Sequence, residues 1–197
     1  MKKVDGAKEK IIEAAVGLIN ESEGDAADIN TRAIAERAGV GVGLINYHFQ
    51  TKENLLEICV ERIIGEVIAA FNPPYPPAAP PLTRAKSTAK LVFDFLVDHP
   101  AVSRISILSD LKNPQPMDNT MRSAMGIQYI MGGLDLPERE RSILAFALVS
   151  AMQALFLRRE QSGALFGYDI NRKEQRDGVL DLLVENLLGG LPVCRKN

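Results

Sequence analysis

Apolar residues recur three and four positions apart along most of this chain, and this periodicity constrains the fold more than any other feature. In the segment 7–20, for example, apolar side chains fall on one helical face at Ile11, Ile12, Ala15, Leu18 and Ile19. No stretch alternates apolar and polar residues for long enough to predict a strand. The sequence therefore predicts an all-α fold of about nine helices.

Glycines, prolines and short polar stretches separate the expected helices, which cover residues 7–20, 31–38, 42–49, 52–71, 84–98, 99–111, 117–131, 137–161 and 172–188. The polar segment 21–28 contains Gly24 and is expected to be a loop. Residues 72–82 contain six prolines, which cannot continue a helix. We expect this stretch to be a stiff connector, and a ligand for a polyproline-recognising module is the alternative.

Charge and cysteine content limit the function only weakly. The net charge is −2, and residues 1–71 contain 8 Lys and Arg against 12 Asp and Glu. Any DNA-binding hypothesis must therefore depend on where the charges lie. Cys59 and Cys194 lie far apart with no metal-ligand pattern near them, so two free thiols in a reducing cytoplasm are expected. No signal peptide or membrane span is expected.

The segment 31–49 is the most informative, because it has the pattern of two short helices that cross at a steep angle. Small Ala35 is expected at the crossing, and Gly39 at a turn that needs a positive φ. Ile45 and Phe49 are four residues apart and are expected to share the inward face of the second helix. The outward-facing residues would then be Val42, Gly43, Leu44, Asn46 and Tyr47.

This spacing alone is also compatible with a helical hairpin that binds no partner. The flanking residues favour a helix-turn-helix that binds DNA. Thr31 could cap its helix and donate to a phosphate. Lys52 stands at the N-terminus of the following helix, where backbone N–H groups and the helix dipole favour an anion.

From about Ala7 to Leu56 the sequence resembles the TetR family of bacterial regulators. The resemblance is carried by Thr31-Arg32, Ala38-Gly39-Val40, Tyr47-His48-Phe49 and Lys52-Glu53-Asn54-Leu55. It implies that Thr31, Tyr47, His48 and Lys52 hold phosphates. It also implies that Arg32 is a candidate base reader.

Several positions differ from the usual family pattern, notably Gly41, Val42 and Asn46. Asn46 could read adenine, whereas Val42 and Leu44 could only meet a thymine methyl group. His48 could instead be an ordinary core or surface histidine. The lysines at positions 2, 3, 8 and 10 could form a mobile basic arm or simply a solvated face.

The expected helix 137–161 is apolar on nearly every face, and the last helix is also apolar over more than one stripe. A monomer of this size covers only one side of such helices, so we expect a second subunit to cover the other. The resemblance implies the same homodimer, built as a four-helix bundle from the last two long helices.

The middle of the chain is rich in aromatic and methionine side chains that could line an apolar pocket. The predicted effector pocket consists of Phe93, Met121, Met125, Tyr129, Phe146 and Met152. Ordinary core positions are the alternative for each of them.

These observations predict a helix-turn-helix DNA-binding domain at residues 1–51 and an effector-binding and dimerisation domain at 52–197. Within the second domain, 52–71 would be a linking helix and 72–82 the proline-rich linker. The predicted function is a cytoplasmic repressor that a small, largely apolar effector releases from a palindromic operator. The rival hypotheses are a ligand-independent architectural DNA-binding protein of the same fold, and an enzyme. No catalytic residues, metal site or cofactor are predicted.

Overall fold

A computed structural model describes residues 2–22, 29–69, 72 and 75–190, with side chains from residue 6 onward. The described residues form ten α-helices and one short 3-10 helix, and they form no β-strand. This confirms the all-α prediction. The chain divides into two compact units, of which unit 1 is Met1–Phe71 with His99–Asn113 and unit 2 is Asn72–Asp98 with Pro114–Asn197.

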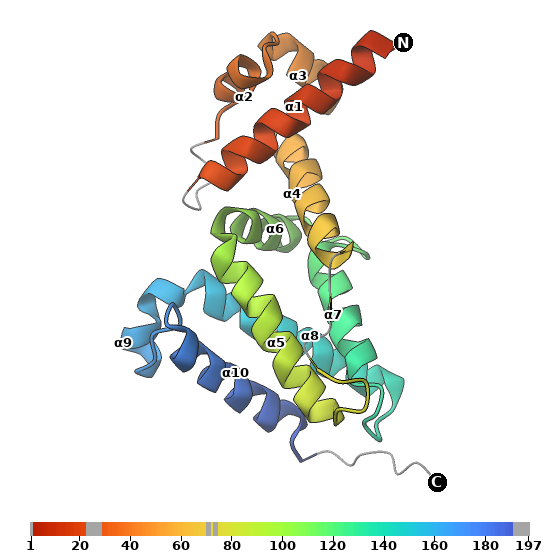
Figure 1. The fold of residues 1–197 in the computed structure, drawn as a ribbon, viewed down its shortest axis with the longest axis vertical. Helices are drawn as coiled ribbons and strands as arrows, with labels where there is room; N and C mark the ends of the chain where they lie inside the picture. Colours follow the sequence, from red (N-terminus) through yellow and green to blue (C-terminus); the bar gives the residue numbers. More distant parts are fainter. Residues whose placement is uncertain (1, 23–28, 70–71, 73–74, 191–197) are drawn as a thin grey trace. The chain divides into compact units, whose positions relative to one another are not determined.

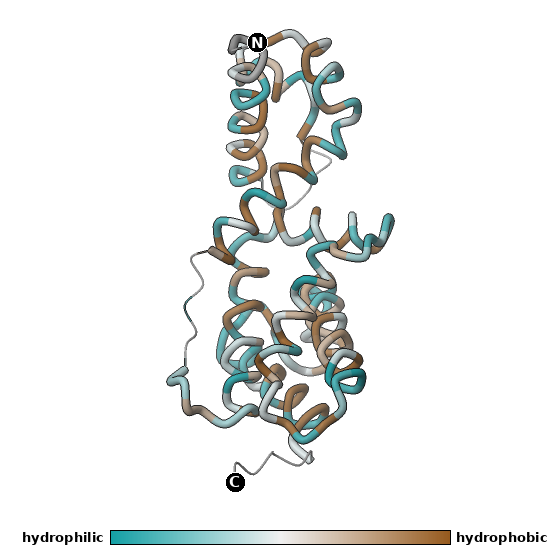
Figure 2. The backbone as a smooth tube through the Cα atoms, turned by 90° about the vertical axis from the view of Figure 1, so that its right-hand side faces the viewer, coloured by the Kyte–Doolittle hydropathy of each residue, from teal (hydrophilic) through white to brown (hydrophobic). Residues whose placement is uncertain are grey.

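Unit 1 contains five helices: α1 (Lys2–Glu21), α2 (Thr31–Ala38), α3 (Val42–Phe49), α4 (Lys52–Ala69) and α6 (Pro100–Lys112). Helix α1 packs against the other four, and α4 packs against α3 and α6 (Figure 1). Figure 2 shows hydrophobic and hydrophilic positions alternating along the helix that follows the N-terminus. The hydrophobic side of α1 contributes Ile11, Ala15 and Ile19 to the core, all fully buried.

Cys59 lies in this core and is a free, buried thiol. Burial raises its pKa to about 12, because the thiolate would lose its hydration. Cys59 therefore stays protonated and acts as a small apolar side chain. The second cysteine, Cys194, lies outside the described residues.

Unit 2 contains α5 (Pro81–Asp98), α7 (Asn119–Ile130), α8 (Glu138–Leu157), the 3-10 helix η1 (Arg159–Gln161), α9 (Ser162–Phe166) and α10 (Lys173–Leu188). Helix α8 packs against α7, α5 and α10. By length and composition alone, α8 is the one described helix that could cross a membrane, and 28% of its apolar stretch is buried. The core helix of a soluble bundle passes the same test. Much of this helix is only half-buried within one chain, and Ile143, Phe146 and Ala154 are exposed.

Three helix limits differ from the prediction by more than two residues. Helix α1 begins at Lys2, so the backbone of the predicted basic arm is helical. Helix α5 begins at Pro81 and not at Arg84, because proline is well tolerated in the first helical turn. The helix predicted for 137–161 ends at Leu157, and α9 follows it. Ser162 stabilises this break, since its hydroxyl donates to the Arg159 carbonyl and accepts the Ile170 N–H.

By packing, α4 and α6 belong with the N-terminal helices in unit 1. The predicted boundary after residue 51 is therefore not a boundary between compact units. The functional division, in which residues 1–51 bind DNA and residues 52–197 bind an effector and form the dimer, stays a prediction.

Candidate nucleic-acid interface

The turn between α2 and α3 has the geometry predicted for a helix-turn-helix. Gly39 has φ 67° and ψ 35°, the left-handed conformation that a residue with a Cβ rarely adopts. The next N–H, of Val40, donates to the Ala35 carbonyl at 3.0 Å and closes the end of α2. Ala35 is 4% exposed at the helix crossing, where a larger side chain would separate the helices. The predicted left-handed turn at Gly39 is confirmed, and Ala35 is buried as expected.

The start of α2 differs from the prediction. Asn30, and not Thr31, is the N-cap, because the Asn30 Oδ1 accepts the Ala33 N–H at 2.8 Å. Thr31 is the first residue of the helix and is half-buried, and Arg32 beside it is exposed. The hydroxyl of Thr31 is therefore not needed for capping, which leaves it available to other partners.

Helix α3 is anchored by its inward face and exposes the opposite one. Ile45 and Phe49 are each 1% exposed, as predicted from their spacing, whereas Tyr47 is 74% exposed. Val42, Gly43 and Asn46 are also exposed, and Leu44 is half-buried. Leu44 is thus less available for a base contact than the other residues predicted to face outward.

His48 lies in the last turn of α3, and its side chain is half-buried. Its ring meets the Tyr47 ring edge-on, with 5.1 Å between the centroids. The His48 Nε2 atom is buried and has no hydrogen-bond partner. In this arrangement, a phosphate contact by His48 would have to use Nδ1.

Helix α4 begins directly beside α3. The Thr51 hydroxyl accepts the Asn54 N–H at 3.1 Å, so Thr51 caps this helix. Lys52 is the first residue of α4 and is half-buried. The candidate phosphate-binding residues Tyr47, His48 and Lys52 therefore lie on two consecutive helices joined by a two-residue turn.

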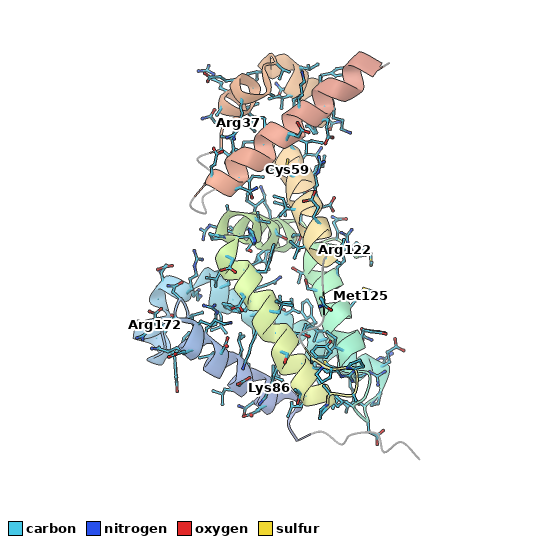
Figure 3. All side chains as sticks on the ribbon, in the orientation of Figure 1. Arg37, Cys59, Lys86, Arg122, Met125 and Arg172 are labelled. Carbon is cyan, nitrogen blue, oxygen red and sulfur yellow. The ribbon has the colours of Figure 1, made fainter. Side chains whose placement is uncertain are left out.

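Ion pairs separate the cations of unit 1 into two groups. Arg37 on α2, labelled in Figure 3, donates two hydrogen bonds of 2.6 Å to Glu21 on α1. These hydrogen bonds lower the pKa of Glu21 and raise that of Arg37. Arg62 is paired with Glu9 in the same way, joining α4 to α1. Arg32, in contrast, forms no ion pair with any described residue. Its guanidinium could therefore bind DNA even though the N-terminal segment is net acidic.

The six residues of the predicted effector pocket lie in unit 2 at different depths. Phe93 and Met152 are fully buried, and Met121 is half-buried. Met125 is 49%, Phe146 47% and Tyr129 87% exposed. A hydrogen bond of 2.9 Å from Gln153 to Thr120 joins α8 to α7 next to Met152 and Met121. These two residues therefore come from adjoining turns of packed helices, and the pocket as a whole stays a prediction.

A groove that the sequence did not predict lies within unit 1, between the first turns of α4 and the second half of α6. Its volume is about 720 Å³. Its walls include Lys52 and Glu53 of α4 and Arg104 and Lys112 of α6, with Leu56 among its apolar residues. Within the described residues, no group of three or more His, Cys, Asp or Glu side chains could hold a metal ion.

Comparison with known proteins identifies the helix-turn-helix. Residues 11–59 match the family described as "Bacterial regulatory proteins, tetR family". Over nearly its whole length the chain is also similar to the HTH-type transcriptional regulator BetI from Cronobacter sakazakii. The two are 26% identical over 196 residues, which cover 94% of this chain and 93% of BetI. Residues 11–59 of the chain are therefore similar to the helix-turn-helix domain of the TetR family.

Solved structures of TetR proteins share the fold of the chain. A TetR transcriptional regulator from Rhodococcus sp. RHA1 has a TM-score of 0.63 at 18% identity, covering 94% of this chain and 97% of the other. The TetR regulator SCO7222 from Streptomyces coelicolor has a TM-score of 0.58 at 21% identity, covering 92% of each chain. The matched family and the BetI relative support a DNA-binding transcriptional regulator with an N-terminal helix-turn-helix.

Some residues that shape this candidate interface were not predicted from the sequence. The Asn30 cap could have been found, because asparagine precedes a helix there and is a favoured N-cap. The Glu21–Arg37 pair spans the loop between α1 and α2, and no local pattern joins those positions. Gln50, between α3 and α4, has a positive φ of 65°, for which glutamine gives no signal.

Proposed function

We propose that this protein is a cytoplasmic, dimeric repressor of the TetR family that binds a palindromic operator through α3 and is released by a small, largely apolar effector. The observation that carries the proposal is the two-sided character of α3. Ile45 and Phe49 fix the helix in unit 1, and Val42, Asn46 and Tyr47 are exposed on it. An exposed, rigidly anchored helix after a tight turn is suited to enter a major groove.

Two kinds of contact follow from this arrangement. Thr31, Tyr47, His48 and Lys52 hold phosphates and set the register of the protein on DNA. Arg32 and Asn46 read base edges, and Val42 and Leu44 meet thymine methyl groups. A Cβ at position 43 would meet no atom within 4 Å and would project outward from the helix. Because Gly43 lacks this Cβ, the backbone of α3 can lie closer to the DNA.

The dimer would form on α8 and α10, which pack against each other in unit 2. Ile143 is 61% and Phe146 47% exposed on α8, and Leu182 is 55% exposed on α10. Water-exposed apolar side chains on two adjoining helices favour coverage by another apolar surface. A second copy of the same face would supply it and would relate the two α3 helices by a twofold axis.

Selection from a random pool of duplexes tests the DNA-binding part. Wild-type protein should enrich a twofold-symmetric site with half-sites about one helical turn apart, and its affinity should fall steeply with salt. Lys52→Ala should weaken binding to the selected and to a scrambled duplex by the same factor, and reduce the salt slope by about one. Lys112→Ala, an exposed lysine of α6, is the control and should leave both affinities unchanged. Wild-type binding by the Lys52 variant would contradict the phosphate assignment.

Reciprocal titration tests the effector part. We expect an apolar or aromatic ligand to bind among Phe93, Met121, Met125, Tyr129, Phe146 and Met152. Since binding linkage is reciprocal, the ligand should weaken binding to the selected duplex about five- to 150-fold, and the duplex should weaken ligand binding by the same factor. A ligand that occupies this pocket without changing either affinity would favour the ligand-independent architectural protein. Loss of ligand binding on substitution of groove residues in unit 1 would place the effector site there instead.

A further inference from the structure

The turn that joins α3 to α4 is strained at Gln50. Its φ is 65° and its ψ −53°, and among the residues that the structure describes it is the only one other than glycine with a positive φ. The Thr51 N–H donates to the Phe49 carbonyl at 2.7 Å, which closes a three-residue γ-turn around Gln50. A γ-turn with positive φ is rare, because the Cβ of the central residue crowds the backbone.

Contacts on both sides hold this turn in place. The Phe49 carbonyl also accepts the Asn54 side-chain N–H at 2.9 Å, so it is bound from the turn and from α4. The Gln50 N–H donates to the Asn46 carbonyl at 3.0 Å and closes the last turn of α3. Phe49 and Leu55, fully buried on either side, anchor the two helices. A strained conformation persists only where its surroundings determine it in this way, and such positions cluster at functional sites.

We propose that Gln50 and Asn54 are positioning residues for DNA binding, a proposal that rests on the function proposed above for α3. An ordinary left-handed residue has ψ near +47°, so relaxing Gln50 from −53° would rotate ψ by about 100°. That rotation would turn α4 relative to α3. The strained turn therefore sets the distance and direction between Tyr47 and His48 at the end of α3 and Lys52 at the start of α4, which must meet the DNA backbone together.

A matched pair of substitutions at Gln50 separates the backbone from the side chain. Gln50→Ala removes the side-chain amide but keeps the Cβ and its strain, whereas Gln50→Gly removes the strain and lets the turn adopt other conformations. The Gly variant should melt at a higher temperature than the Ala variant, yet bind the selected duplex about five- to tenfold more weakly than wild type. Such a loss corresponds to a binding-competent turn in about 10–20% of molecules. The Ala variant should bind within about twofold of wild type.

A second variant tests the hydrogen bond that holds the turn. Asn54→Ala should weaken DNA binding in the same direction, and it should add little to the loss in the Gln50→Gly background, because both changes release the same turn. Asn20→Ala, at an exposed asparagine of α1, is the control and should bind like wild type.

The proposal is overturned if the Gly and Ala variants lose affinity equally, which would indicate a side-chain contact with DNA. It is also overturned if the Gly variant binds like wild type, or if the Ala variant melts above the Gly variant. If wild-type protein enriches no sequence at all, the proposed operator binding fails instead. The order of the melting temperatures then still decides whether Gln50 is strained.

Discussion

Replacing Asp94 by asparagine should lower the free energy of unfolding by about 3 kcal/mol, because it leaves the buried charge of Arg176 without a counterion. Arg176 on α10 is 5% exposed. Its Nη2 lies 2.7 Å from the Asp94 Oδ1 on α5, and its Nη1 donates to the carbonyls of Ile170 and Asn171, each at 3.2 Å. Asparagine retains the size of the side chain but not the charge. Urea unfolding followed by circular dichroism measures the loss.

The dependence of this effect on pH gives a second measurement. Burial raises the pKa of Asp94, but the hydrogen bonds and charges of Lys173 and Arg176 outweigh burial and lower it overall. A carboxyl whose folded pKa is lowered stabilises the fold above its unfolded pKa of about 4, and this stability is lost as the pH falls through the folded pKa. The difference between wild type and Asp94→Asn should therefore be complete at neutral pH and shrink below about pH 4.

Lys173→Ala is the matched control, since Lys173 contacts the same carboxylate but has a side chain that is 59% exposed. Exposed pairs contribute little, so we expect a loss of less than about 1 kcal/mol. An unchanged unfolding free energy for Asp94→Asn, or equal losses for both variants, would contradict the role given to the buried pair.

The Asp94–Arg176 and Asp94–Lys173 pairs are two of four ion pairs that join α5 to α10. Lys86, labelled in Figure 3, pairs with Glu185 at 2.5 Å, and Lys90 pairs with Asp181 at 2.9 Å. Positions 86, 90 and 94 are successive turns of α5, and their partners run in the opposite direction along α10. The pairs thus hold α10, one of the two helices on which we propose the dimer forms, antiparallel to α5.

Introducing glutamate at both Ile143 and Leu182 should convert the proposed dimer to a monomer and weaken binding to the selected palindromic duplex about a hundredfold or more. The loss is large because two linked DNA-binding domains bind a palindromic site far more tightly than one. Both side chains are more than half exposed, so the monomer should keep its helical content and melting behaviour. Light scattering gives the mass, and fluorescence anisotropy the affinity.

Leu165→Glu provides the control for this experiment. Leu165 on α9 is 56% exposed, so the change in surface character is similar, but it lies outside α8 and α10. The control should remain dimeric and bind DNA normally. A double variant of Ile143 and Leu182 that stays dimeric would exclude this face as the subunit interface.

How far the sequence predicts this structure depends on whether the deciding interaction is local. The limits of α2 and α3 were predicted to the residue, because Gly39 ends one helix through its own backbone conformation and the apolar spacing of Ile45 and Phe49 defines the other. The break after Leu157 was missed, since the Ser162 hydroxyl that stabilises it contacts Ile170 across an eight-residue separation.

The candidate sites show the same division. Helical spacing correctly predicted that Ile45 and Phe49 share the buried face of α3. The residues expected to face outward are exposed except for Leu44, which is half-buried. The effector residues were chosen by type, and type does not determine depth: Met152 is buried whereas Tyr129 is 87% exposed. The strain at Gln50 could not be predicted, because glutamine has no preference for a positive φ and no local pattern signals the contacts that hold the turn.

The central claim, that α3 reads the operator, is tested most directly by the sequences that an Asn46→Ala variant selects from a random pool. We predict that the base preference flattens at one position in each half-site, and that affinity falls about five- to 150-fold on the wild-type site, equivalent to about 1–3 kcal/mol. Affinity for a scrambled duplex should barely change. Selection of the wild-type sequence by this variant, or an equal loss on both duplexes, would contradict the claim.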